Sequence, residues 1–296
     1  MIFRTALAGI ATALVAVGAT AAPLLYTNVA CGACLITSQD TTTGARVGTF
    51  TQDKGNGRGV VVVGDNIFYT TANSGNVFKR SVSSNADLGI AFNVAGSSGL
   101  QAISFDGTDF WVGDYSGTTK AYKYSITGTL LSTITLNNGL ATGAGAIEGF
   151  YDGLEYFNGK LIANRYDGGF KRASGQQYDI YNLDGTISQL GFINTLGQGN
   201  GTGIAFDGTD FFVSDIGNSR ATRWSGLTGA FLGAINLGGG GLSNIEDLSV
   251  DFAGRVDTCG KPGQPPCIGT VPTPGTLPLV VLALCGVGAM LKRRRG

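Results

Sequence analysis

An internal repeat constrains the fold of this chain more than any other feature of its sequence. Residues 105–110 read FDGTDF, and residues 206–211 read FDGTDF again. A related copy lies between them in residues 153–193, and another precedes them in residues 59–92. The period is therefore about 50 residues, which is the length expected of one propeller blade.

Each copy contains the same order of short strands and turns. A first strand ends at a tight turn in which Gly stands beside Asp or Asn, because hairpin turns of this kind need a positive φ angle. A strand rich in aromatic and aliphatic residues follows, then a polar loop, a third strand, a second Gly turn and a fourth strand. Four strands per repeat predict an all-β propeller with four-stranded blades. We interpret three carboxylates as turn-forming residues: Asp106, Asp184 and Asp207.

The two ends of the body predict how the ring closes. Residues 24–50 match the last three strands of a blade, and residues 245–251 match a first strand. Pairing them in one sheet would remove the exposed edges of an open array. We therefore expect a propeller over residues 22–257 with five blades. Six blades are the alternative if residues 252–257 form a further hairpin, and two packed sheets are the main rival fold.

The N-terminus has the pattern of a secretory signal peptide. Arg4 supplies a positive charge, residues 6–17 are apolar apart from Gly and Thr, and Ala19 and Ala21 are the small residues before a cleavage site. We expect residues 1–21 to be removed on export.

The C-terminus ends in a short apolar run followed by basic residues. Residues 277–291 carry no charge, and they fall short of the about 20 residues that a straight transmembrane helix needs. The basic residues 292–295 would stay in the cytoplasm by the positive-inside rule. A buried helix is the alternative, although the run is not amphipathic. Both ends thus predict that the body lies outside the cytoplasmic membrane, joined to the transmembrane segment by a Gly/Pro/Cys linker in residues 258–270.

The tail, residues 271–296, resembles a PEP-CTERM sorting signal. A Pro-x-Pro approach, an apolar span and an Arg cluster at the chain end occur in that order, although Thr273 stands where the family usually has Glu. The residues that carry the resemblance are Val271, Pro272, Thr273, Pro274, Arg293, Arg294 and Arg295. The body also resembles NHL-type β-propellers in its pattern of turns and strands.

The PEP-CTERM resemblance implies an exported protein of a Gram-negative bacterium. Its tail would be recognised and removed by an exosortase, an integral-membrane enzyme similar to cysteine transpeptidases. The protein would be tethered to the inner membrane before processing and would then be periplasmic, at the cell surface or extracellular. The family also implies a connection to extracellular polysaccharide.

Four cysteines lie in two pairs near the ends of the body. Disulfides are the default in an oxidising compartment, and four cysteines allow three connectivities. A C-x-x-C redox motif and a zinc site are the alternatives, but the first lacks a thioredoxin-like βαβ context and the spacing disfavours the second. The candidate disulfide residues are Cys31, Cys34, Cys259 and Cys267.

The chain contains no histidine. This excludes Ser-His-Asp and Cys-His catalysis and removes the commonest acid–base group at neutral pH. Five of the 20 basic residues lie in the two end segments, which leaves 15 basic against 20 acidic residues in the body, and such a balance disfavours nucleic-acid binding. We expect a non-enzymatic binding or scaffold propeller whose partner is a polysaccharide or an envelope protein, with no nucleic-acid partner.

Carboxylates near the starts of the inner strands are the remaining candidates for chemistry. Their oxygen atoms would suit Ca²⁺, so a Ca²⁺-dependent hydrolase or lyase in the channel is the alternative function. An acidic, solvated channel rim is the simpler interpretation of the same residues. Asp114 and Asp215 end second strands, and we expect them to bind loop amides. The candidate Ca²⁺ ligands are Glu148, Asp152, Glu246 and Asp247.

Aromatic residues offer a second candidate surface. They could stack on sugar rings, but their alternation with polar residues favours packing between blades. The residues concerned are Trp111, Tyr115, Tyr122, Tyr124, Tyr166, Tyr178, Tyr181 and Trp224.

Overall fold

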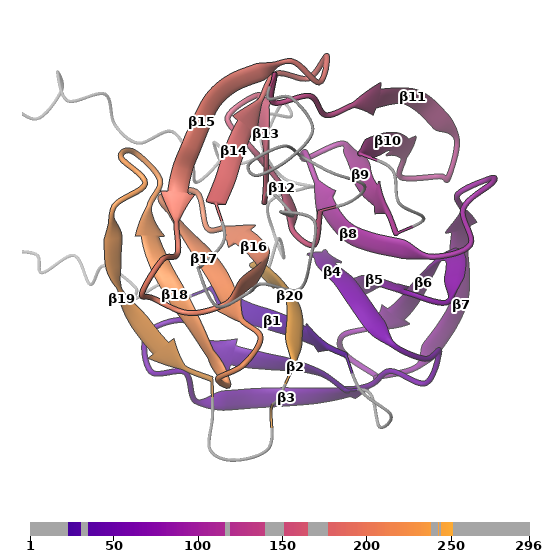
Figure 1. Ribbon diagram of the computed structural model, residues 1–296. Coiled ribbons are helices and arrows are strands. Elements are labelled where there is room, and N and C mark those ends of the chain that lie inside the picture. Colours follow the sequence, from indigo (N-terminus) through magenta and orange to yellow (C-terminus); the bar gives the residue numbers. More distant parts are fainter. Residues whose placement is uncertain are drawn as a thin grey trace, which may run out of the picture.

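A computed structural model describes residues 23–30, 35–115, 119–139, 151–164, 177–237, 242 and 244–250. Within these residues, the strands form five four-stranded sheets arranged around one axis (Figure 1). The predicted five-bladed β-propeller is therefore confirmed, and the rival fold of two packed sheets is wrong. No helix in these ranges is long and apolar enough to cross a membrane.

The inner strands of neighbouring blades contact one another around the axis (Figure 1). The inner strands are β4, β8, β12, β16 and β20. In four blades the strands run outward in chain order: β4 (Gly57–Val63), β5 (Asn66–Thr71), β6 (Ser74–Ser81) and β7 (Asp87–Asn93); β8 (Leu100–Phe105), β9 (Asp109–Asp114), β10 (Lys120–Ser125) and β11 (Leu130–Thr135); β12 (Leu154–Phe157), β13 (Lys160–Asn164), β14 (Gln177–Tyr181) and β15 (Ile187–Asn194); β16 (Gly201–Phe206), β17 (Asp210–Asp215), β18 (Arg220–Ser225) and β19 (Phe231–Asn236).

The fifth blade is built from both ends of the body. Its order is β20 (Ile245–Val250), β1 (Leu24–Val29), β2 (Leu35–Asp40) and β3 (Arg46–Thr51). The last strand of the described chain thus pairs antiparallel with the first strand, which confirms the predicted closure of the ring. Because β20 is also the innermost strand, the closing strand contacts β4 and β16 of both neighbouring blades.

The turn aspartates act as the sequence predicts. Asp106 Oδ1 accepts hydrogen bonds from the amides of Thr108 at 3.0 Å and Asp109 at 2.8 Å, and the following Gly107 has a φ of 94°. Asp207 makes the same pair of bonds in β16–β17, and Asp184 accepts the amide of Thr186 at 2.9 Å. These bonds confirm the turn interpretation.

Side chains packed between the blades form the core. Phe110, for example, lies 4.6 Å from Phe68 of the preceding blade between ring centroids. Of the aromatic residues that we singled out, Tyr166 lies outside the described residues and Tyr115 and Tyr122 are partly buried. The packing interpretation is confirmed for the remaining five, which are at most 3 % exposed: Trp111, Tyr124, Tyr178, Tyr181 and Trp224.

Candidate functional site

Each blade places a polar side chain at an equivalent position, on the inner strand in four blades and two residues before the inner strand β12 in the third. The equivalence follows from the strand register, in which Val60, Ile103 and Ile204 pair with matching residues of the second strands. The polar residue stands two positions before this aliphatic residue in every blade. The five members, which we call the polar ring, are Arg58, Gln101, Asp152, Thr202 and Glu246, and all are at least nine-tenths buried.

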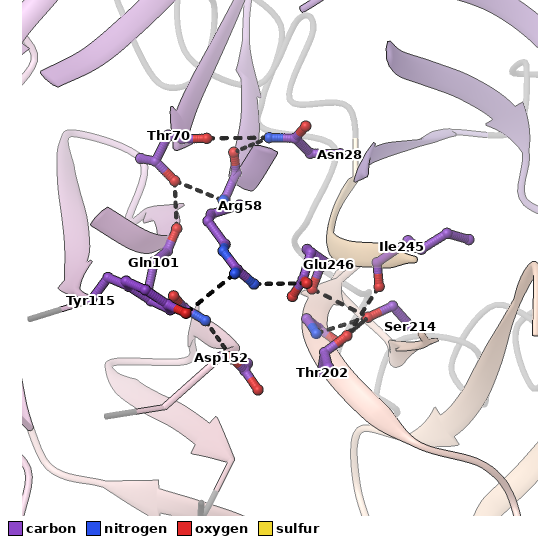
Figure 2. Close-up of polar contacts among 12 residues, drawn as sticks. Asn28, Arg58, Thr70, Gln101, Tyr115, Asp152, Thr202, Ser214, Ile245 and Glu246 are labelled. Atoms are coloured by element: carbon purple, nitrogen blue, oxygen red, sulfur yellow. Dashed lines mark hydrogen bonds and ion pairs between the residues drawn. The ribbon is translucent and has the colours of Figure 1, made fainter. Parts of the chain in front are cut away.

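A β-bulge directs these side chains. The pairing of the first two strands shifts between Gly57 and Val60, between Leu100 and Ile103, and between Gly201 and Ile204. The extra residue in a bulge re-aims a side chain that would otherwise alternate between the two faces of the sheet. The repeated bulges therefore let the ring residues approach one another near the axis (Figure 2).

The residue after each ring position is small in four blades, because the inner strands approach closely there. A Cβ at Gly59 would lie 2.6 Å from the backbone nitrogen of Ile103 in the next blade. A Cβ at Gly203 would meet the Cα and the Oδ1 of Asp247. Glycine is required at these two positions by the contact with the adjacent blade rather than by its backbone angles.

Side chains of the second strands hold the bulges in place. The backbone amide of Gly59 donates to Thr70 Oγ1 at 2.7 Å, and that of Gly203 donates to Ser214 Oγ at 2.8 Å. In the third blade, the amide of Gly153 donates to Asn164 Oδ1 at 2.8 Å. Three blades therefore satisfy the same buried backbone donor in the same way, which fixes the backbone beneath the ring.

An ion pair joins two ring residues from neighbouring blades. Arg58 Nη1 donates to Glu246 Oε1 at 2.7 Å, and the side chains of Arg58 and Glu246 are 10 % and 5 % exposed (Figure 2). The guanidinium carbon also lies 4.7 Å from the ring centroid of Tyr115, which follows β9. Three blades thus meet at Arg58, whose planar charged group is suited to both partners.

Gln101 and Asp152 form the second contact of the ring. The Gln101 side-chain amide donates to Asp152 Oδ1 (Figure 2). The backbone carbonyl of Gln101 accepts the hydroxyl of Thr70 from the neighbouring blade. Among the described residues, neither Gln101 Oε1 nor Arg58 Nε has a hydrogen-bond partner. The ring therefore presents a buried acceptor and a buried donor that remain available to a bound molecule.

Asp247 joins three blades. Its Oδ2 accepts the amide of Val60 at 3.1 Å and its Oδ1 accepts the amide of Ile204 at 3.3 Å, so that β20 is bound to β4 on one side and β16 on the other. Burial raises the pKa of Asp247 well above its ordinary value, the charge of Glu246 adds to the rise, and the backbone bonds oppose it. Asp247 therefore serves ring closure.

Glu155 is a second buried carboxyl near the axis. Burial raises the pKa of this side chain well above its ordinary value, and the charge of Asp247 raises it further. Glu155 therefore keeps its proton at pH values where the unfolded chain has lost it. Since the folded state then binds more protons, the stability contributed by this group falls as pH rises above 4.5, the ordinary pKa of the group.

Replacing Glu155 by Gln is expected to remove this loss. The variant should gain stability relative to the wild-type protein at pH 7 and should lose that advantage near pH 4.5, the ordinary pKa of the replaced carboxyl. Urea unfolding of both proteins across this pH range measures the difference. The exposed Asp184, whose pKa is lowered by bonds to Thr186, provides the control: Asp184→Asn should cost stability at pH 7. Parallel curves for wild-type and Glu155→Gln would contradict the assignment.

The predicted site residues are distributed unequally. Asp152 and Glu246 belong to the polar ring, whereas Asp247 points into the contacts between blades. Within the described ranges, no three His, Cys, Asp or Glu side chains gather as a metal site. The other predicted site residues lie outside the described residues: Glu148, Cys31, Cys34, Cys259, Cys267, Val271, Pro272, Thr273, Pro274, Arg293, Arg294 and Arg295.

Asp114 and Asp215 bind more varied partners than loop amides. Asp215 Oδ1 accepts the amide of Asn200 at 3.1 Å as predicted, but its Oδ2 also binds Arg220 Nε at 2.7 Å. Asp114 accepts hydroxyl groups, from Ser97 at 2.9 Å and from Tyr122 at 3.1 Å. The expectation of amide partners is therefore correct in part for Asp215, and hydroxyl and guanidinium partners have to be added to it.

Three members of the polar ring were not predicted from the sequence: Arg58, Gln101 and Thr202. The signal that reveals them is an aligned triplet at the inner strands, which is polar, small and aliphatic in four blades and has Asp at its middle position in the fifth: RGV, QAI, DGL, TGI and EDL in chain order. Their register was obscured because the turns, rather than the strand starts, align most clearly between copies.

These features define the class of protein: a closed five-bladed β-propeller with a buried polar ring at one end of its inner strands. No family model matches the chain, and no curated protein matches it either.

The chain is similar to solved structures. A chain in a crystal structure of a nidogen/laminin complex superposes with a TM-score of 0.50 at 11 % identity, covering 78 % of this chain and 98 % of that chain. Myxococcus xanthus glutaminyl cyclase superposes with a TM-score of 0.42 at 16 % identity, covering 61 % and 70 % of the two chains. At these identities the likeness concerns the fold alone.

Proposed function

We propose that the protein is an exported binding propeller that holds its ligand at the polar ring. The observation that carries this proposal is the contrast between neighbouring positions of the repeat. Next to the ring, equivalent positions converge on aliphatic residues and, in four blades, on Gly or Ala. At the ring, the same five blades carry five different polar side chains.

That contrast separates a binding role from a structural one. A purely structural position in a repeat can be filled by the same residue in most blades, as Gly is in the turn between the first two strands of the four blades that run in chain order. Burying five different polar groups costs free energy, because each must be desolvated and given a partner. A ligand that binds several unlike groups at once would account for retaining such an arrangement.

Binding is favoured over catalysis by the groups that are present. Without histidine in the chain, acid–base chemistry would fall to carboxylates. Glu246 already binds Arg58, and Asp152 already binds Gln101. The alternative, a Ca²⁺-dependent hydrolase or lyase, would need these carboxylates to turn from their partners to the metal ion.

The two chain ends support export and sorting. The signal peptide in residues 1–21 and the PEP-CTERM-like tail in residues 271–296 have the order of elements that such signals require. We propose that an exosortase-like enzyme of the inner membrane processes the tail. The propeller then acts in the periplasm, at the cell surface or outside the cell, where its partner is a polysaccharide or an envelope protein.

Deleting residues 271–296 is expected to change the location of the protein without unfolding it. The full chain should first appear in the inner membrane and then as a shorter mature form, whereas the deletion variant should be secreted without passing through the membrane fraction. Pulse labelling followed by fractionation measures both. Replacing Arg293, Arg294 and Arg295 together by Gln provides a matched variant that retains the apolar segment. Identical fractionation of all three chains would overturn the sorting proposal.

A further inference from the structure

We infer that the polar ring binds an uncharged, hydroxyl-rich small molecule, that is, a neutral sugar unit or polyol. This inference rests on the proposed binding function and names its ligand class. It follows from three properties of the ring: the charges of Arg58 and Glu246 already pair with each other, the unsatisfied atoms of Arg58 and Gln101 are a donor and an acceptor, and these two side chains come from neighbouring blades.

The ion pair disfavours a charged ligand at Arg58 or Glu246. Arg58 and Glu246 form an ion pair at 2.7 Å, and both side chains are buried. An anion that bound Arg58 would leave Glu246 as an uncompensated buried charge, and a cation that bound Glu246 would leave Arg58 in the same position. Breaking a buried pair in this way is strongly unfavourable. A neutral ligand can contact both groups while the ion pair persists.

The unsatisfied atoms favour a hydroxyl group. Gln101 Oε1 can accept a hydrogen bond and Arg58 Nε can donate one, and neither has a hydrogen-bond partner among the described residues. Gln101 is 1 % exposed and Arg58 is 8 % exposed, so solvent has little access to either side chain. A hydroxyl both donates and accepts, whereas an ammonium only donates and a carboxylate only accepts. A molecule with several hydroxyls can therefore satisfy both kinds of atom.

The geometry of the ring fits a molecule with neighbouring hydroxyls. Arg58, Gln101 and Asp152 carry flat forked groups, each with two polar positions side by side, and they come from three blades in succession. One arm of the Gln101 fork binds Asp152, and the two Nη atoms of Arg58 bind Glu246 and Tyr115. Gln101 Oε1 and Arg58 Nε therefore offer one contact each, from neighbouring blades, to two hydroxyls of one ligand. The Thr202 hydroxyl, from the fourth blade, is engaged with the protein: it donates to the backbone carbonyl of Ile245 at 3.1 Å and lies 2.8 Å from Ser214 Oγ.

The half-buried Tyr115 supplies the apolar component of the site. Its ring packs against the Arg58 guanidinium at the edge of the polar ring (Figure 2). An aromatic ring with a polar end suits a ligand that has both C–H groups and hydroxyls. Ligand sites commonly combine such an aromatic surface with a few polar groups that fix orientation.

Titration of the full chain in a zwitterionic, sugar-free detergent tests the inference. The neutral probes are glucose, galactose, mannose and inositol, and the charged probes are glucosamine, glucuronate and CaCl₂. Saturation-transfer NMR and calorimetry measure the binding of each. We expect at least one neutral probe to bind with a Kd of about 1 mM or lower, which corresponds to about −4 kcal/mol, and to bind at least tenfold more tightly than the charged probes.

Variants locate the binding. Gln101→Leu should weaken the neutral probe at least tenfold, and Arg58→Lys, which retains a positive charge opposite Glu246, should also weaken it. Gln189→Leu makes the same substitution at an exposed position of β15 and should bind as the wild-type protein does. If Gln101→Leu melts at a lower temperature, Gln101→Met, which keeps the unbranched shape of the side chain, replaces it as the test.

Three outcomes would contradict the assignment of a neutral sugar or polyol to the polar ring. Preferential binding of glucosamine, glucuronate or Ca²⁺ that Gln101→Leu abolishes would overturn the neutral-sugar inference while leaving the binding propeller intact. Sugar binding that is unchanged in all three ring variants would overturn the ring as its site. Absence of binding by every probe at 50-fold excess over the expected Kd of about 1 mM would overturn the inference as well.

Discussion

Asp247→Ala is expected to lower the free energy of unfolding by about 2–6 kcal/mol. The carboxylate accepts the amides of Val60 and Ile204, which belong to the two blades on either side of the closing blade. Removing it leaves two buried donors without partners, and each such donor costs about 1–3 kcal/mol. Urea denaturation followed by tryptophan fluorescence measures the change, because Trp111 and Trp224 are both buried in other blades.

The same substitution at an exposed turn provides the control for this prediction. Asp184 accepts the amide and the hydroxyl of Thr186 on the surface, so Asp184→Ala should cost much less stability than Asp247→Ala. Asp247→Asn should be intermediate, since its one carbonyl oxygen can replace one of the two acceptors. Equal losses in Asp247→Ala and Asp184→Ala would show that the three-blade contact contributes no special stability.

Removal of β20 should have a still larger effect. A chain that ends at residue 244 lacks Ile245, Leu248 and Val250, which are buried in a core cluster with Leu25 and other residues of β1 and the fourth blade. Burial of each aliphatic side chain contributes about 1.5–3 kcal/mol, so their combined loss is comparable with the about 5–15 kcal/mol that stabilises a typical domain. We expect this chain to show no cooperative unfolding transition.

A chain that ends at residue 257 provides the comparison. It retains β20 and lacks the linker in residues 258–270 and the tail in residues 271–296, so its unfolding transition should resemble that of the full chain. Thermal melting and limited proteolysis measure both truncations. Cooperative melting of the chain that ends at residue 244 would contradict ring closure by β20. Failure of the chain that ends at residue 257 to fold would show that the tail contributes to the fold.

The fold could be predicted from the sequence because its determinants are local. The Asp-Gly and Asn-Gly turns recur at a nearly constant period, and each turn depends on residues within four positions of it, such as Asp106 with Thr108 and Asp109. Closure was also predictable, since the body begins with three strands of a blade and ends with the missing first one.

The polar ring was harder to predict from the sequence because its contacts join distant parts of the chain. Asp152 and Glu246 could be selected as carboxylates at strand starts, but their partners Gln101 and Arg58 lie in other blades. Spacing in the sequence does not encode a contact between residues that only ring closure brings together. Asp247 was assigned to the channel with them because a bulge, which the sequence does not mark, turns neighbouring side chains in different directions.

The pairing of β1 with β20 also determines which way the molecule would face on a surface. Leu25 pairs with Val250, so the body begins and ends at the same end of the axis. Asn28 and Asp247, beside the ring residue Glu246, pair at the opposite end of these two strands. A tether that continues from Val250 would therefore be attached near the axis of the propeller, on one of its two faces. Under the proposed attachment to the membrane, the polar ring would lie on the opposite face, which is turned away from the membrane.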